Sequence, residues 1–74
     1  MRSVCEMPIG QSAALVEICG EAPLARRLIE MGFHRGCMVQ VISHAPFGGP
    51  IVVRIHESVV ALRRSEAQCL RVAA

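Results

Sequence analysis

The chain has 74 residues, of which 53% are hydrophobic and 19% are charged, and its formal net charge is +2. This composition predicts one small folded domain rather than a disordered tail, and the length leaves little volume for the deep pocket of an enzyme. With two Phe and no Trp or Tyr, sites built from stacked aromatic side chains are disfavoured. The arginines are too scattered for a nucleic-acid-binding surface. The sequence therefore favours a compact, non-enzymatic binding or regulatory module.

The sequence also indicates a cellular compartment. No apolar run approaches the ~20 residues that cross a bilayer, and the first ten residues contain no apolar signal-peptide core. We therefore expect a cytoplasmic protein that does not insert into a membrane. The cysteines form no CxxC pair, so we expect reduced thiols that behave as small buried hydrophobes. These cysteines are Cys5, Cys19, Cys37 and Cys69.

The first predicted elements are a strand over residues 12–18 and a helix over residues 22–31. Residues 1–6, which precede the strand, are expected to be loosely ordered or peripheral. Pro23 suits the first turn of the helix because its missing N–H needs no partner there. Gly32 suits the left-handed position that ends a helix. The apolar stripe of the helix, at positions i, i+4 and i+7, consists of Leu24, Leu28 and Met31.

Residues 37–43 and 51–56 are rich in β-branched residues and alternate between apolar and polar side chains, which predicts an antiparallel hairpin. We expect Val41 to lie opposite Val53, because that register buries one face and leaves the other partly polar. The other pairs in this register are Val39 with Ile55, Gln40 with Arg54 and Met38 with His56.

Three short elements complete the chain: a strand over residues 58–63, a helical turn over 65–68 and a strand over 68–72. The turn is predicted because Ser65 and Gln68 resemble a capping box. Five short strands and one helix in an early connection indicate a mainly β fold, a small and strongly bent barrel that forms a single domain over residues 1–74. The predicted core consists of Leu24, Leu28, Val39, Val41, Val53, Ile55 and Leu62.

Histidine and cysteine side chains raise the question of a metal site. His44 and His56 lie at opposite ends of the predicted hairpin, about 20 Å apart at ~3.3 Å per residue, which is too far for one ion. His34 and Cys37 are neighbours, but two ligands make an incomplete site. The simpler interpretation is surface histidines and no required cofactor. The alternative is a metal sensor or a metal-bridged oligomer, in which Zn²⁺ or Fe²⁺ also binds ligands of a second chain.

The sequence contains no catalytic or phosphate-binding pattern. The candidate functional residues are therefore charged and aromatic side chains that we expect to be exposed and able to contact a partner protein. Arg26 and Arg27 either solvate the outer face of the helix or contact an acidic partner. Phe47, at the tip of a loop rich in Pro and Gly, is either tucked over the barrel or presented to a partner. Arg54 lies on the polar face of the hairpin. These four residues are the predicted partner contacts.

Three segments follow one another in a fixed order along the chain: LARRLIEMGFHRG, HAPFGGP and ALRRSEA. Together they resemble the FeoA family of small bacterial iron-uptake proteins, and the resemblance extends from about Met7 to Val72. One departure is His34-Arg35, which stands where a Pro often precedes the glycine. The motif residues are Leu24, Leu28, Gly32, Gly36, Pro46, Gly48, Gly49, Pro50 and Leu62.

The resemblance implies an SH3-like barrel and a role beside FeoB, the membrane ferrous-iron permease with a cytosolic GTP-binding domain. It implies binding to FeoB and modulation of its transport or GTPase activity, at the cytoplasmic face of the membrane. A homo-oligomer remains open. A similar domain forms the C-terminal module of iron-dependent repressors of the DtxR type. This chain is too short for their DNA-binding and metal-binding domains, so we expect the transport role.

Overall fold

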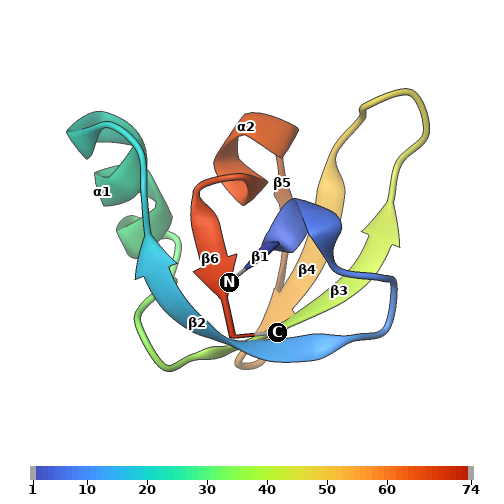
Figure 1. The fold of residues 1–74 in the computed structure, drawn as a ribbon, viewed down its shortest axis with the longest axis horizontal. Coiled ribbons are helices and arrows are strands. Elements are labelled where there is room, and N and C mark those ends of the chain that lie inside the picture. The colour runs from blue at the N-terminus through green and yellow to red at the C-terminus, as the bar shows by residue number, and fades with distance from the viewer. Residues whose placement is uncertain (1, 74) are drawn as a thin grey trace.

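In the computed structural model, residues 2–73 form a six-stranded antiparallel sheet with two α-helices and one 3₁₀ turn (Figure 1). The elements are β1 (Arg2–Ser3), η1 (Val4–Glu6), β2 (Ser12–Ile18), α1 (Ala22–Glu30), β3 (Met38–His44), β4 (Ile51–Ile55), β5 (Ser58–Leu62), α2 (Arg64–Ala67) and β6 (Leu70–Val72). The mainly β class and the strand positions agree with the sequence prediction. The strand order is β1-β6-β2-β3-β4-β5, so the sheet is strongly curved but its hydrogen bonding does not close into a barrel.

The N-terminal segment contributes to the core. β1 pairs with β6, with Arg2 opposite Val72, and Val4 is fully buried at 0% exposure. The expectation that residues 1–6 are peripheral is therefore wrong for the part that the structure describes, while residue 1 lies outside it. The physical reason is size, because a domain this small has too few apolar residues in its main elements and completes its core with residues near its N-terminus.

Helix α1 has Pro23 in its first turn, as predicted, and ends in a Schellman motif. The Gly32 N–H donates to the Ile29 carbonyl at 3.0 Å, and the Phe33 N–H donates to the Leu28 carbonyl at 3.1 Å. Gly32 has a φ of 111°, the left-handed conformation that the sequence predicted. The motif turns the chain inward, so that Phe33 and Leu28 are both completely buried.

The β3–β4 hairpin has the predicted register. Its central pairs are Val39 with Ile55, Gln40 with Arg54 and Val41 with Val53. The predicted pair of Met38 with His56 does not form, because β4 ends at Ile55 and His56 begins the turn into β5. The alternation of apolar and polar residues therefore predicted the register correctly, but the predicted second strand of the hairpin extended one residue beyond the observed end of β4.

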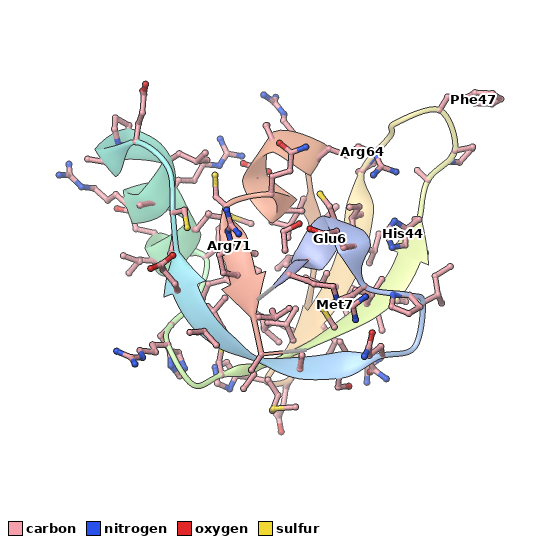
Figure 2. The ribbon with its side chains drawn as sticks, viewed as in Figure 1. Glu6, Met7, His44, Phe47, Arg64 and Arg71 are labelled. Atoms are coloured by element: carbon pink, nitrogen blue, oxygen red, sulfur yellow. The ribbon has the colours of Figure 1, made fainter. Side chains whose placement is uncertain are left out.

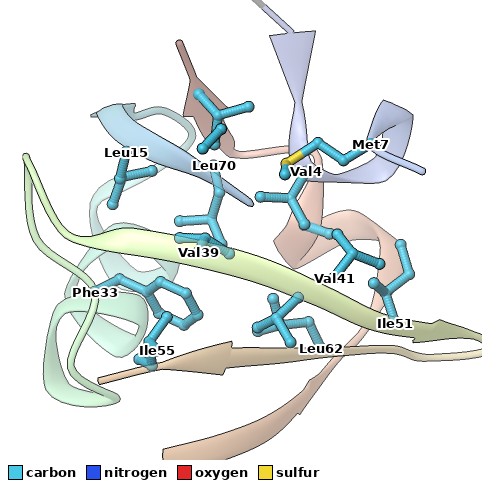
Figure 3. Packing of buried hydrophobic residues seen from close by; sticks show 14 of the residues in the cluster. Val4, Met7, Leu15, Phe33, Val39, Val41, Ile51, Ile55, Leu62 and Leu70 are labelled. Atoms are coloured by element: carbon cyan, nitrogen blue, oxygen red, sulfur yellow. The ribbon is translucent and has the colours of Figure 1, made fainter. Parts of the chain in front are cut away.

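The core lies on the concave side of the sheet, where side chains from several strands meet (Figure 3). Every predicted core residue is buried except Leu24, which is half-buried and packs against the edge of the cluster. The fully buried residues that the prediction missed include Val4, Met7, Leu15, Phe33, Ile51 and Leu70. Among the described residues, no helix is long and apolar enough to cross a membrane.

Candidate functional site

A buried carboxylate connects the two helices. Glu66 is 4% exposed, and its Oε1 accepts the backbone N–H of Arg63 at 2.8 Å. Its Oε2 lies 3.1 Å from Nε of Arg27. Glu66 therefore caps α2, which corrects the predicted capping box of Ser65 and Gln68. Arg27 is not simply a solvated arginine, since it neutralises a buried charge.

The predicted partner contacts do not form one patch. Arg26 and Arg27 are exposed on α1, whereas Phe47 lies on the β3–β4 loop, at the opposite side of the view in Figure 1. Arg54 is exposed on β4, where it lies opposite Gln40 of β3 and Val59 of β5. The structure therefore does not place Phe47 beside the basic face of α1, and the two are separate candidate contact surfaces.

Phe47 is presented to solvent rather than tucked over the sheet. Its exposed fraction is 104%, and Figure 2 shows the ring pointing away from the rest of the chain. The loop is held by two backbone hydrogen bonds, from Ala45 N–H to the Pro50 carbonyl and from Gly49 N–H to the Pro46 carbonyl, at 3.0 and 3.2 Å. Of the two alternatives for Phe47, the structure therefore excludes a ring packed against the sheet and shows a ring exposed to solvent.

The loop around Phe47 has little room for larger residues. A Cβ added at Gly49 would lie 2.8 Å from Cβ of Ala45, so the glycine permits a close approach of the chain. Phe47 has a φ of 57°, which is uncommon for a bulky residue. Below the loop, Nε of half-buried Arg64 lies 3.8 Å from the position of a Cβ at Gly48. The loop that displays the aromatic ring is therefore tightly packed at Gly49, and one arginine, Arg64, lies next to Gly48.

The metal-ligand candidates separate into different parts of the molecule. Cys37 is buried in the core while His34 is exposed, so this pair does not converge. His44 is at the loop end of β3, where its Nε2 donates to the Met7 carbonyl at 2.9 Å. His34 and His56, which the sequence did not bring together, have their Nε2 atoms 3.1 Å apart. Residues 2–73 contain no group of three or more metal-binding side chains.

A groove that sequence reasoning missed lies between β2 and the end of α1. It has a volume of about 530 Å³, within the range of ligand pockets, and its lining is mostly apolar. The lining residues are Val16, Glu17, Ile18, Ile29, Phe33, His34 and Arg35. The available signal was Ile29, which lies off the predicted apolar stripe of the helix and is 58% exposed.

The thiols of Cys5 and Cys19 have raised pKa values. Burial raises the pKa of the Cys5 thiol above its usual range. The pKa of Cys19 is also raised, chiefly because its thiol donates to Oε1 of Glu17 at 3.0 Å and a thiolate would face that carboxylate. All four cysteines are free thiols, and Cys37 is buried as the sequence predicted, whereas Cys5, Cys19 and Cys69 are only half-buried.

The curved sheet, the short helix between β2 and β3 and the helical turn before β6 define a small SH3-like β domain. A solved structure of FeoA from Stenotrophomonas maltophilia, described as a prokaryotic SH3 domain protein complexed with zinc, matches with a TM-score of 0.85 and 31% identity. The match covers 99% of this chain and 91% of that one. A manganese-dependent transcriptional repressor matches with a TM-score of 0.91 at 22% identity, over 99% of this chain and 41% of that one, which shows the fold alone.

The sequence relationship is more specific than the fold. A family model described as the FeoA domain matches residues 2–74, so the chain belongs to the FeoA family. A fusion protein of Fe(2+) transport protein A with Fe(2+) transporter FeoB, from Porphyromonas gingivalis, is 34% identical over 67 residues. That match covers 90% of this chain but 8% of the fusion protein. The family resemblance noted in the sequence is therefore confirmed.

Proposed function

We propose that this chain is a non-enzymatic module that binds the cytosolic part of FeoB and modulates its transport or GTPase activity. The observation that carries the proposal is the related protein in which an FeoA-like segment and the FeoB transporter form one polypeptide. Joining two modules in one chain gives them a high effective concentration for each other. By the same reasoning, the FeoA domain described here acts on FeoB through a surface of its own, at the cytoplasmic side of the membrane.

Phe47 is the first candidate for that surface. A fully exposed aromatic side chain leaves apolar area in water, and its burial by a partner is worth about 2 kcal/mol. Aromatic and arginine side chains also dominate the binding energy of many interfaces, and Arg64 lies at the base of this loop. We expect Phe47 to insert into an apolar pocket of FeoB that has acidic residues at its rim.

The test is calorimetric titration of the full chain into the isolated cytosolic domain of FeoB, with and without a GTP analogue and Fe²⁺. We expect saturable binding that Phe47→Ala weakens by about thirtyfold, the equivalent of about 2 kcal/mol. Ile9→Ala is the matched control, since Ile9 is another exposed large apolar residue on a different loop. Binding that depends on nucleotide supports a role in the GTPase cycle, and independent binding supports assembly.

Charge-reversal variants test the remaining contacts. Arg26→Glu probes the basic face of α1, and Arg54→Glu probes the outer face of the hairpin. Arg27→Glu is unsuitable as a binding probe, because it also places a second carboxylate beside buried Glu66. If neither the cytosolic domain nor full-length FeoB in detergent binds the folded wild-type chain, the proposed function is wrong.

A further inference from the structure

Two histidines from distant parts of the sequence meet on the surface. Nε2 of His34 lies 3.1 Å from Nε2 of His56, and the ring centroids are 5.1 Å apart with the planes inclined by 20°. Since the nitrogens are closer than the centroids, they lie on the facing edges of the two rings. Two nitrogen ligands of one tetrahedral ion, each at ~2.1 Å from it, are about 3.4 Å apart. We propose that His34 and His56 form a binding site for a divalent transition-metal ion.

The hydrogen bonding of His34 prepares its ring for this role. Nδ1 lies 3.1 Å from the carbonyl oxygen of Arg35, which can only accept a hydrogen bond. Nδ1 of the neutral ring therefore carries the proton and donates it, and Nε2 has a free lone pair. Metal-binding histidines typically donate their other ring N–H to a carbonyl or a carboxylate in this way. Without an ion, Nε2–H of His56 donates to that lone pair, and with an ion the His56 proton resides on Nδ1.

The backbone of His34 is held in place on both sides. On one side the Schellman motif buries Phe33 in the core. On the other side, Gly36 N–H donates to the Leu15 carbonyl at 2.7 Å, which fastens the turn to β2. The His34 carbonyl itself accepts the Cys37 N–H at 3.1 Å. These contacts fix the position of the His34 backbone, and therefore the position from which its side chain extends.

His56 is fixed in a comparable way. His56 is the first residue of the two-residue turn that joins β4 to β5. The turn connects Ile55, which is buried, to Ser58, and Ile55 and Ser58 pair with each other in the β4–β5 ladder. Its φ of 52° is a left-handed conformation that hairpin turns normally assign to Gly, Asn or Asp. A Cβ placed on Gly32 would lie 3.4 Å from Cδ1 of Ile55, so the turn after α1 packs against the end of β4. The fold thus preorganises both ligands, and little ordering entropy is lost when an ion binds.

The donor set selects the class of ion. Neutral imidazole nitrogens suit Zn²⁺, Cu²⁺, Ni²⁺ and Fe²⁺, whereas Mg²⁺ and Ca²⁺ prefer oxygen ligands. Two ligands leave two positions of a tetrahedral ion open, because no third metal-binding side chain joins them within residues 2–73. Water fills these positions in a single chain, and the same pair of a second copy fills them in a symmetric dimer. The site is independent of the proposed FeoB contact at Phe47.

The probe for the site is Zn²⁺, titrated by calorimetry into the reduced, metal-free full chain. We expect saturable binding that His34→Gln and His56→Asn each weaken at least tenfold, since each removes one of two ligands. Asn is chosen at position 56 because it tolerates a left-handed backbone. His44→Gln is the control and should bind Zn²⁺ as the wild type does, since His44 is at the other end of the hairpin. One ion per chain indicates water as the remaining ligand, and one ion per two chains with dimerisation in sedimentation indicates a second copy.

Two further measurements separate this site from the cysteines. In ¹⁵N spectra of the histidine rings, Zn²⁺ should shift Nε2 of His34 and His56 and leave His44 unchanged. With Co²⁺ as the ion, we expect an absorption spectrum without thiolate charge-transfer bands. The proposal is overturned if Zn²⁺ does not bind, if both histidine variants bind it at full affinity, or if thiol alkylation abolishes binding. Circular dichroism melts confirm that the variants are folded.

Discussion

The contact between Arg27 and Glu66 allows a sharp test of how the two helices are joined. Arg27→Glu replaces an attraction at 3.1 Å by the repulsion of two carboxylates, one of which is buried. Breaking a fully buried pair costs about 3–5 kcal/mol, and losing a surface pair costs about 0.2–1 kcal/mol. The Arg27 side chain is 61% exposed and that of Glu66 is 6% exposed, so the pair lies between these limits. We expect Arg27→Glu to lower the free energy of unfolding by about 2–3 kcal/mol.

The assay is urea and thermal unfolding followed by far-ultraviolet circular dichroism, because the chain has no Trp or Tyr for fluorescence. In a domain of this size about 1 kcal/mol shifts Tm by ~4–8 °C, so a loss of about 2–3 kcal/mol in Arg27→Glu should lower Tm by about 8–24 °C. Arg26→Glu is the matched control, with the same chemical change on the neighbouring exposed residue, and should stay within about 0.5 kcal/mol of the wild type.

A double-mutant cycle then isolates the ion pair from the rest of α1. Glu66→Gln keeps an oxygen that can accept the Arg63 N–H but removes the charge. We expect Arg27→Ala to cost about 1–2 kcal/mol in the wild type and at least 1 kcal/mol less in the Glu66→Gln background. The reasoning is refuted if Arg27→Glu is as mild as Arg26→Glu, or if the cost of Arg27→Ala is the same in both backgrounds.

Three other predictions concern packing, thiol chemistry and the displayed loop. Leu28→Ala should lower the free energy of unfolding by about 2–5 kcal/mol in a urea titration, and Leu24→Ala by clearly less, since only Leu28 is fully buried; equal costs would contradict this packing. At pH 8 Cys19 should react with iodoacetamide more slowly than a model thiol, because its pKa is raised, and Glu17→Gln should accelerate the reaction. Peptide mass mapping measures each site, and an unchanged Cys19 rate in Glu17→Gln would count against the hydrogen bond. Phe47→Ala should leave Tm within a few degrees of the wild type, since the ring is fully exposed, and a large loss of stability would show that it packs in the fold.

Local sequence patterns determined much of this fold. The 3.6-residue stripe containing Leu28, with Pro23 before it and Gly32 after it, located α1 to within one residue. The alternation of apolar and polar residues set the β3–β4 register, because a shift by one residue would have put Arg54 in the core. Three motifs in order then indicated the family, which the match over residues 2–74 confirms.

Contacts between distant segments were decided only by the tertiary structure. Val4 joins the core from the 3₁₀ turn η1, directly after the two-residue strand β1, and both elements are too short to show any periodicity. Glu66 resembles an ordinary acidic residue until the fold buries it against Arg27. His34 and His56 are 22 positions apart and belong to different turns, so their pairing depends on how the end of α1 packs on the end of β4. Hydrophobic periodicity records which face of an element is buried, whereas these polar pairs depend on the angle at which two elements cross, and no local pattern contains that angle.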